Sequence, residues 1–246
     1  MTSTGRSELR GPWVLPGDGS RASHWVKRTF DAVGSALLLL VLAPLLAFLM
    51  LVIRLEGPGS PVFQQQRIGA RRVRAGEGWS WEVRSFTMYK LRTMHQDADE
   101  SLHRDYMAAY VAGDDVAMVE LQPAADAATS YKLAADPRIT RVGRVLRTLS
   151  LDELPQLWNV LKGDMSLVGP RPPLPYEVVH YEPRHLRRLA AVPGITGWWQ
   201  VNGRCETSFE EMVRLDLEYL ERRSLTMDLR ILGKTLPAMC KTRGAG

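Results

Sequence analysis

The feature that most constrains the fold is an uninterrupted apolar segment near the start of the chain. Residues 36–53 read ALLLLVLAPLLAFLMLVI, and no charged side chain interrupts them. A straight helix of this length would measure about 27 Å, close to the roughly 30 Å hydrocarbon core of a bilayer. A run this long and uniformly apolar disfavours a buried helix of a soluble core. The segment therefore predicts a membrane helix.

The centre and the flanks of this segment determine how it is expected to enter the membrane. Pro44 stands at the centre, where it removes a backbone hydrogen bond and bends a helix. Basic residues flank both ends, including Lys27 and Arg28 before the segment and Arg54 and Arg67 after it. Because positive charges stay on the cytoplasmic side, both ends are expected in the cytosol. This favours a re-entrant helix broken at Pro44, with a single spanning helix as the alternative.

The remaining sequence predicts a mainly α fold with a small β component. Residues 1–25 are rich in Gly, Ser, Arg and Pro, which predicts a disordered tail. Residues 26–56 form the predicted re-entrant hairpin, and residues 57–240 form a compact cytosolic domain with amphipathic helices at the membrane interface. Composition and turn signals predict paired strands over 62–68 and 81–89, helices over 95–119, 150–162, 209–222 and 225–239, and a small hairpin around 198–201.

The charge distribution favours anionic partners. The formal net charge is +5, and basic residues gather beside the apolar segment and again over 138–147. This pattern suits lipid headgroups or phosphorylated substrates. Nucleic acid is disfavoured because the sequence contains no nucleic-acid-binding motif. Cys205 and Cys240 stand in unrelated contexts and are expected to be reduced thiols, with a single disulfide between them as the alternative.

Two adjacent carboxylates, Asp152 and Glu153, are the candidates for chemistry. The stretch Ser150-Leu-Asp-Glu153 matches a helix capping box, in which Ser150 and Glu153 only satisfy backbone donors. Asp152 is not needed for that cap. An ionised carboxylate in the first turn of a helix can attack phosphorus, so a structural and a catalytic interpretation both remain open.

A carboxylate pair that works on phosphate needs cations, because like charges repel. The candidate phosphate-binding residues are Lys90, Arg92, Arg147 and Arg171, the last in the turn Gly169-Pro-Arg-Pro-Pro173. Prolines limit the backbone freedom of Arg171, which makes a merely solvated side chain less expected there. Asp152 and Glu153 together with a phosphate would also suit Mg²⁺, which prefers hard oxygen ligands.

The ordered set of motifs resembles the bacterial sugar transferases that are small monotopic phosphoglycosyl transferases. The resemblance covers residues 25–240, although 97–135 follow no fixed pattern and the N-terminal membrane domain of larger members has no counterpart. The matching motifs are KRTFD (27–31), GSPVFQQQRIG (59–69), YKLRTM (89–94), DPRITRVGRVLR (136–147), SLDELPQLWNVLKGDMSLVGPRP (150–172), PGITGWWQVNGR (193–204), and LDLEYL with SLTMDLRIL within 215–232.

The resemblance implies an activity and a set of residue roles. Such enzymes move a sugar-1-phosphate from a nucleotide sugar, usually UDP-linked, to polyprenyl (undecaprenyl) phosphate, release UMP and need Mg²⁺. Asp152 is implied as the nucleophile of a covalent phosphosugar intermediate, and Glu153 as a metal ligand or acid/base group. Lys90, Arg147 and Arg171 are implied as phosphate ligands. The implied location is the cytoplasmic face of the bacterial inner membrane, at the first membrane step of surface glycan assembly.

Other functions compete with this expectation. A non-enzymatic membrane scaffold for glycan assembly would use the acid pair as a cap and the cations as a lipid-binding face. A membrane-bound hydrolase would share the nucleophile and the metal but use water as the acceptor. The sequence leaves the sugar, the glycan pathway, the role of residues 97–135 and the oligomeric state open, a homodimer included.

Overall fold

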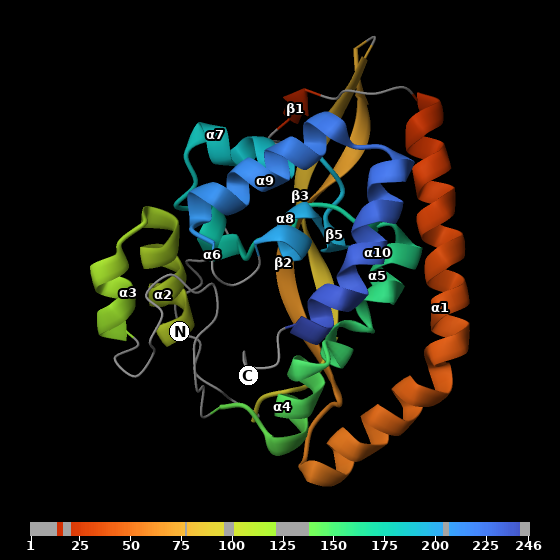
Figure 1. Ribbon diagram of the computed structural model, residues 1–246, viewed down its shortest axis with the longest axis vertical. Helices are drawn as coiled ribbons and strands as arrows, with labels where there is room; N and C mark the ends of the chain where they lie inside the picture. The colour runs from red at the N-terminus through yellow and green to blue at the C-terminus, as the bar shows by residue number, and fades with distance from the viewer. Residues whose placement is uncertain are drawn as a thin grey trace.

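The computed structural model describes residues 14–16, 21–76, 78–95, 101–121, 138–203 and 207–241. The chain is mainly helical with a small β component, as predicted. A long helix, α1, runs along one side of the domain, and α2 and α3 lie on the opposite side (Figure 1). The hairpin of β2 and β3 and the helices α5, α8, α9 and α10 occupy the space between them (Figure 1).

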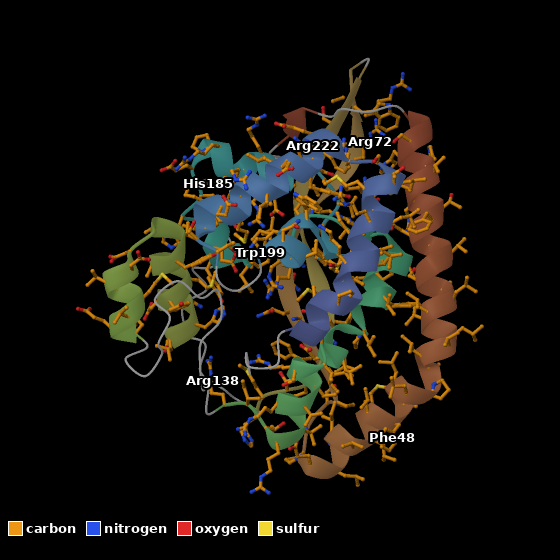
Figure 2. The ribbon with its side chains drawn as sticks, viewed as in Figure 1. Phe48, Arg72, Arg138, His185, Trp199 and Arg222 are labelled. Atoms are coloured by element: carbon orange, nitrogen blue, oxygen red, sulfur yellow. The ribbon has the colours of Figure 1, made fainter. Side chains whose placement is uncertain are left out.

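Helix α1 (Arg21–Glu56) carries the apolar segment and is continuous through Pro44. It changes direction between its N-terminal and C-terminal halves (Figure 1), and Phe48 lies on the second half (Figure 2). The stretch Ser23–Glu56 has a mean hydropathy of 3.1 over its most apolar window, and only 11% of that window is buried. Such low burial is unlike a core helix. The bend agrees with the expected effect of Pro44, while the re-entrant arrangement stays a prediction.

Polar contacts attach the N-terminal half of α1 to the domain. The Arg28 guanidinium donates to the Val160 and Leu161 carbonyls at 2.7 and 2.6 Å. Lys27 pairs with Asp228 of α10 at 2.7 Å. These contacts begin a few residues before the apolar stretch, and the helix that carries this stretch is therefore attached directly to the domain. Of residues 1–25, predicted to be disordered, Val14–Pro16 form β1 and α1 begins at Arg21.

A long antiparallel hairpin forms the main sheet. Strand β2 (Val62–Ala75) pairs with β3 (Gly78–Leu91) along its full length, and β1 adds to β3 opposite Ser80–Glu82. The predicted pairing of 62–68 with 81–89 is confirmed. The strands extend further than predicted, since the whole arginine-rich stretch 71–74 belongs to β2 rather than to a turn. Arg71 and Arg74 are exposed, whereas Arg72 is half-buried and lies 4.9 Å from the centre of the Trp79 ring.

Asn159 holds α5 (Gln156–Lys162) against the open edge of β3. Its side-chain amide donates to the Thr87 carbonyl at 2.7 Å, and its side-chain oxygen accepts from the Tyr89 amide at 3.1 Å. Asn159 is fully buried. The amide thus replaces a neighbouring strand where β1 no longer covers β3. Val160 and Leu157 of α5 complete the contact in a cluster with Phe86 and Met88.

The predicted hairpin around 198–201 is wrong. Strand β5 (Gly194–Thr196) pairs in parallel with β4 (Ser166–Val168), and the following residues form α8 (Trp198–Asn202). Gly194 permits this pairing, because a Cβ there would lie 2.1 Å from the amide nitrogen of Gly169. Trp199 is buried at the centre of the domain (Figure 2) and donates to Thr207 at 2.6 Å, so it packs in the core.

The other helices enclose these sheets. The predicted helix over 95–119 is divided into α2 (Ser101–Ala112) and α3 (Asp115–Leu121), because the chain turns at Gly113 with φ of 68°. The helices predicted over 209–222 and 225–239 are confirmed as α9 (Phe209–Arg222) and α10 (Leu225–Lys241). The remaining short helices are α4 (Arg141–Thr148), α6 (Pro175–Val178), α7 (Pro183–Leu186) and the 3-10 turns η1 (Leu151–Glu153) and η2 (Arg187–Leu189).

We expect Asn159→Ala to destabilise the domain by about 3 kcal/mol, because it leaves the Thr87 carbonyl and the Tyr89 amide buried without partners. Urea unfolding followed by fluorescence measures this change. Asn202→Ala is the matched control, since Asn202 is exposed and its two side-chain hydrogen bonds, to the Trp198 carbonyl and from Lys234, lie at the surface. Equal destabilisation by the two substitutions would show that the Asn159 side chain does not hold α5 against β3.

Candidate active site

The acid pair stands beside a pocket on the edge of β3. The Lys90 ammonium lies 3.0 Å from Glu153 Oε1 and 3.9 Å from Asp152 Oδ2. Lys90 and Glu153 line the pocket, and Asp152, 8% exposed, lies next to them outside its lining. Lys90 therefore offsets the repulsion between two adjacent carboxylates. The structure brings together the two predicted acids and the first of the predicted cations.

The local backbone excludes the capping box considered from sequence. Ser150 has a left-handed conformation with φ of 54° and, in the described structure, its side chain makes no capping hydrogen bond. Asp152 and Glu153 lie in the single 3-10 turn η1, and α5 begins only at Gln156. The physical reason is Pro155, which has no N–H to continue an α-helical hydrogen bond to Leu151. The prediction of one helix over 150–162 is corrected accordingly.

Arg171 reaches the same pocket from the proline-rich turn. Arg67 of β2 fastens this turn, since its Nη1 donates to the Pro172 carbonyl at 3.0 Å. The neighbouring Ile68 amide donates to the Pro173 carbonyl at 2.9 Å. Both guanidiniums line the pocket with Lys90. The pocket thus presents three cationic side chains from β2, β3 and the turn, which suits a ligand with phosphate groups.

Arg147 lies in the last turn of α4 and faces Thr93, which follows the end of β3. Its Nε donates to Thr93 Oγ1 at 3.1 Å. Helix α4 approaches Thr93 so closely that only glycine fits at position 143. A Cβ on Gly143 would lie 2.1 Å from the Thr93 carbonyl oxygen. Thr140 caps α4 by accepting from the Gly143 amide at 2.9 Å. Arg147 is therefore held near the acid pair without lining the pocket itself.

Arg92 has a different environment from the other predicted cations. Its guanidinium donates to the carbonyls of Ile53, Gly57 and Pro58, where α1 ends and the chain turns back to β2. Among the described residues that line the pocket, Arg92 does not appear. These contacts satisfy orphan carbonyls of the helix C-terminus. The structure therefore gives Arg92 a role in fixing the end of the apolar helix.

Several pocket residues were not predicted from the sequence. From the sequence, Arg67 is only a charge flanking the apolar segment, and Gln156 and Gln200 carry no predicted role, whereas all three line the pocket. All three residues lie inside the motifs that carry the family resemblance, so their place in these motifs could have identified them as candidates. A sequence pattern does not show that an arginine on a strand points into a pocket, which explains the omission of Arg67.

The cations around the pocket affect a histidine on α2. His103 Nδ1 lies 2.7 Å from the Tyr176 hydroxyl. Burial, and then the positive charges of Arg67, Arg138, Arg171 and Arg147 in that order, lower the pKa of His103 to about 4. His103 is therefore neutral at physiological pH. Burial is the largest cause, and the arginine charges extend the positive potential of the pocket to the neighbouring helix.

The two carboxylates beside the pocket supply some of the oxygen ligands that a magnesium ion needs. Within the described residues, no group of three or more His, Cys, Asp or Glu side chains could hold a metal. Mg²⁺ is commonly bound by one or two carboxylates with phosphate oxygens and water completing its octahedron. Asp152 and Glu153 satisfy that requirement when a phosphorylated ligand is bound. The two acids therefore suit a metal that arrives with its substrate.

The chain belongs to the bacterial sugar transferase family, whose model matches residues 22–242. It is 38% identical over 224 residues to the UDP-galactose-lipid carrier transferase of Erwinia amylovora, covering 91% of this chain and 42% of that protein. It is 37% identical to the exopolysaccharide production protein ExoY of Rhizobium meliloti, covering 89% of this chain and 87% of that protein. The chain thus spans less than half of one relative and most of the other.

A third relative is named for a complete reaction. The UDP-glucose:undecaprenyl-phosphate glucose-1-phosphate transferase of Caulobacter vibrioides is 39% identical over 227 residues, covering 89% of this chain and 71% of that protein. All the residues described above as contacting or lining the pocket lie within the part matched by the family model. The pocket is therefore part of the region that defines the family.

We expect Arg92→Gln to destabilise the protein by about 2 kcal/mol, because carbonyls at the end of α1 lose their donor. Affinity for inorganic pyrophosphate should change less than twofold. Arg171→Gln should show the opposite pattern, with affinity reduced about tenfold and stability nearly unchanged. Thermal unfolding and calorimetric titration in nanodiscs measure both quantities, and a large loss of affinity in Arg92→Gln would place Arg92 in the anion site.

Proposed function

We propose that this protein is a phosphoglycosyl transferase of the cytoplasmic face of the bacterial inner membrane. It moves a sugar-1-phosphate from a UDP-sugar to polyprenyl (undecaprenyl) phosphate and releases UMP, as the first membrane step of surface glycan or exopolysaccharide assembly. The names of the relatives support a UDP-hexose donor, with galactose and glucose as the first candidates. Family membership supports the reaction class, and the pocket supports the residue roles.

The observation that carries this proposal is the contact of Lys90 with both carboxylates beside a pocket that also contains Arg67 and Arg171. The acid pair supplies a nucleophile, and the cations bind the charge of the donor. A scaffold protein would have no use for a buried acid directly beside an ammonium group in a pocket. The excluded capping box removes the structural explanation for the pair.

In the first step, an Asp152 carboxylate oxygen attacks the phosphorus atom bound to the sugar. The new bond joins that oxygen to phosphorus, and the bond between phosphorus and the bridging oxygen of the diphosphate breaks. UMP leaves with the electron pair of that bond. Lys90, Arg67 and Arg171 offset the negative charge that moves onto the leaving phosphate. The product on the enzyme is an acyl phosphate, a mixed anhydride of the Asp152 carboxyl group with the sugar phosphate.

In the second step, an oxygen of the polyprenyl phosphate attacks the same phosphorus atom. The bond from phosphorus to Asp152 breaks, the carboxylate is restored, and the lipid carries a sugar diphosphate. The covalent intermediate lets a soluble donor and a membrane-bound acceptor use one cation site in turn. Asp152 and Glu153 would hold Mg²⁺, which supplies charge neutralisation and orientation to the phosphates when it is bound.

The position of the acid pair suits an acceptor at the level of the lipid headgroups. Leu151, the residue before Asp152, packs with Leu49 and Ile53 of α1 and with Leu146 of α4. The second half of the apolar helix therefore contacts the turn that carries the nucleophile. We propose that α1 enters the cytoplasmic leaflet, bends at Pro44 and returns to the same side, which keeps η1 at the membrane surface.

We expect Asp152→Asn to abolish transfer, with UMP release reduced at least roughly 10³-fold, because an amide cannot form the covalent intermediate. The assay measures UMP release from UDP-galactose and UDP-glucose in nanodiscs with Mg²⁺, with and without undecaprenyl phosphate. Asp164→Asn is the matched control, since Asp164 pairs with Arg84 at 2.9 Å and does not line the pocket. Wild-type turnover in Asp152→Asn would contradict the covalent mechanism. Release of more than one UMP per enzyme without the lipid would indicate a hydrolase, because the first step alone releases a single UMP.

We expect both ends of α1 to face the cytosol. Single cysteines at Ser23 and Glu56, introduced into a variant without Cys205 and Cys240, should both react with a membrane-impermeant maleimide added to inside-out vesicles. Neither should react in intact spheroplasts. Reaction of one position from each side would establish a single spanning helix. A Pro44→Leu variant tests whether the proline bend causes the re-entry, because a straight helix should place its two ends on opposite sides of the membrane.

A further inference from the structure

Arg188 and Asp216 form a buried ion pair to which the proposed mechanism assigns no role. Arg188 lies in η2 and Asp216 in α9, and each residue is 1% exposed. Arg188 Nε donates to Asp216 Oδ2 at 2.8 Å, and Nη2 of the same guanidinium donates to that oxygen as well. Among the described residues that line the pocket, neither appears. An ion pair removed from water in this way is costly to bury and adds little net stability.

The guanidinium of this pair reaches the proline-rich turn that carries Arg171. Arg188 Nη2 donates to the Arg171 carbonyl oxygen at 3.4 Å, and Nη1 donates to the Tyr181 hydroxyl at 2.8 Å. The bond to Arg171 is long, so its strength depends on where Asp216 holds the guanidinium. Through this guanidinium, Asp216 of α9 is joined to the backbone of a residue whose own side chain lines the pocket.

The other carbonyls of the turn are fastened from outside in the same way. Each of residues 170–173 offers its carbonyl oxygen to a donor elsewhere in the chain, and the donors are, in order, the Gly194 amide, the Arg188 and Arg67 guanidiniums and the Ile68 amide. Prolines at three of these four positions have no N–H, so the turn cannot satisfy its own carbonyls. Of these four donors, Arg188 is the one that bonds Arg171 itself.

We propose that Arg188 and Asp216 are positioning residues of the anion pocket. Asp216 fixes the Arg188 guanidinium, which holds the Arg171 backbone so that the Arg171 side chain stays directed at a bound phosphate group. Placing a long side chain in advance reduces the conformational entropy that is lost when the ligand binds. The pair acts through Arg171 and touches no substrate. The inference rests on the proposed function only in taking the pocket to bind phosphate.

Two other roles for the pair make different predictions. An ion pair that only stabilises the fold would change the unfolding temperature and leave ligand affinity unchanged. A pair that supports the pocket as a whole would weaken binding through Lys90 and Arg67 as well as through Arg171. The positioning role alone predicts that the effect on binding requires the Arg171 side chain, which a double-mutant cycle measures.

The test is calorimetric titration of inorganic pyrophosphate into the full chain in nanodiscs, with thermal unfolding of each variant. Arg188→Met combined with Asp216→Leu removes both charges together, so that no unpaired charge stays buried and the net charge is unchanged. We expect this double substitution to raise the dissociation constant for pyrophosphate about fivefold. In an Arg171→Gln background, the same double substitution should change it less than about twofold.

Two single variants keep the test independent of the double substitution. Arg188→Lys retains a charge beside Asp216, but its compact ammonium lacks the planar fork that reaches both Asp216 and the Arg171 carbonyl. It should weaken pyrophosphate binding by a similar factor. Tyr181→Phe is the matched control, because it removes a 2.8 Å hydrogen bond from the same guanidinium without changing Asp216 or the turn. It should lower the unfolding temperature and leave the dissociation constant within about twofold of the wild type.

An unchanged dissociation constant in both Arg188 variants would overturn the proposal, as would an equal loss of affinity with and without the Arg171 side chain. Absence of pyrophosphate binding by the wild type would overturn it too. UMP release needs no pyrophosphate and tests the proposed function separately. A protein that releases UMP with undecaprenyl phosphate, and whose Arg188 variants bind pyrophosphate as the wild type does, would keep the proposed function and refute only the positioning role.

Discussion

The arrangement of the pocket depends on how the Asn159 side chain completes the edge of β3. An exposed strand edge has unpaired donors and acceptors, and here one buried amide satisfies both the Thr87 carbonyl and the Tyr89 amide. The contact fixes α5 and the preceding turn η1 beside Lys90, the next residue of the strand. Residues more than sixty positions apart are thereby brought to 3.0 Å, as between Lys90 and Glu153. The acid pair lies beside Lys90 because Asn159, on the helix that follows the pair, completes the hydrogen bonds of the strand edge.

The apolar helix is attached to this assembly at two levels. Before its bend, Arg28 satisfies the Val160 and Leu161 carbonyls at the C-terminus of α5. After its bend, Leu49 and Ile53 pack with Leu146, in the cluster that includes Leu151. The helix thus contacts α5 at one end and the turn of the acid pair at the other. The spacing between the apolar helix and the acid pair is set by direct packing rather than by a flexible linker.

Composition and periodicity predicted those elements that are determined by residues close together in the chain. The apolar segment, the strand pairing and the helices that follow residue 209 were all visible as composition and periodicity. The errors arose where distant residues decide the outcome. Gly194 forms a parallel strand pair because Gly169 leaves space for it, and the sequence around the two tryptophans carries no trace of that contact. Arg92 stays a predicted phosphate ligand on the strength of its motif, and the structure adds carbonyl partners at the end of α1 that the sequence does not reveal.

The balance of charge in the pocket favours exchange over tight retention. Lys90 is paired with Glu153 at 3.0 Å, and Arg67 donates to the Pro172 carbonyl at 3.0 Å and to Gln65 Oε1 at 2.7 Å. An incoming phosphate must therefore compete with acceptors that these cations already have, which reduces the net gain from binding. The proposed reaction, in which two phosphates use one site in turn, needs such moderation. Cations without these partners would hold the first anion more tightly.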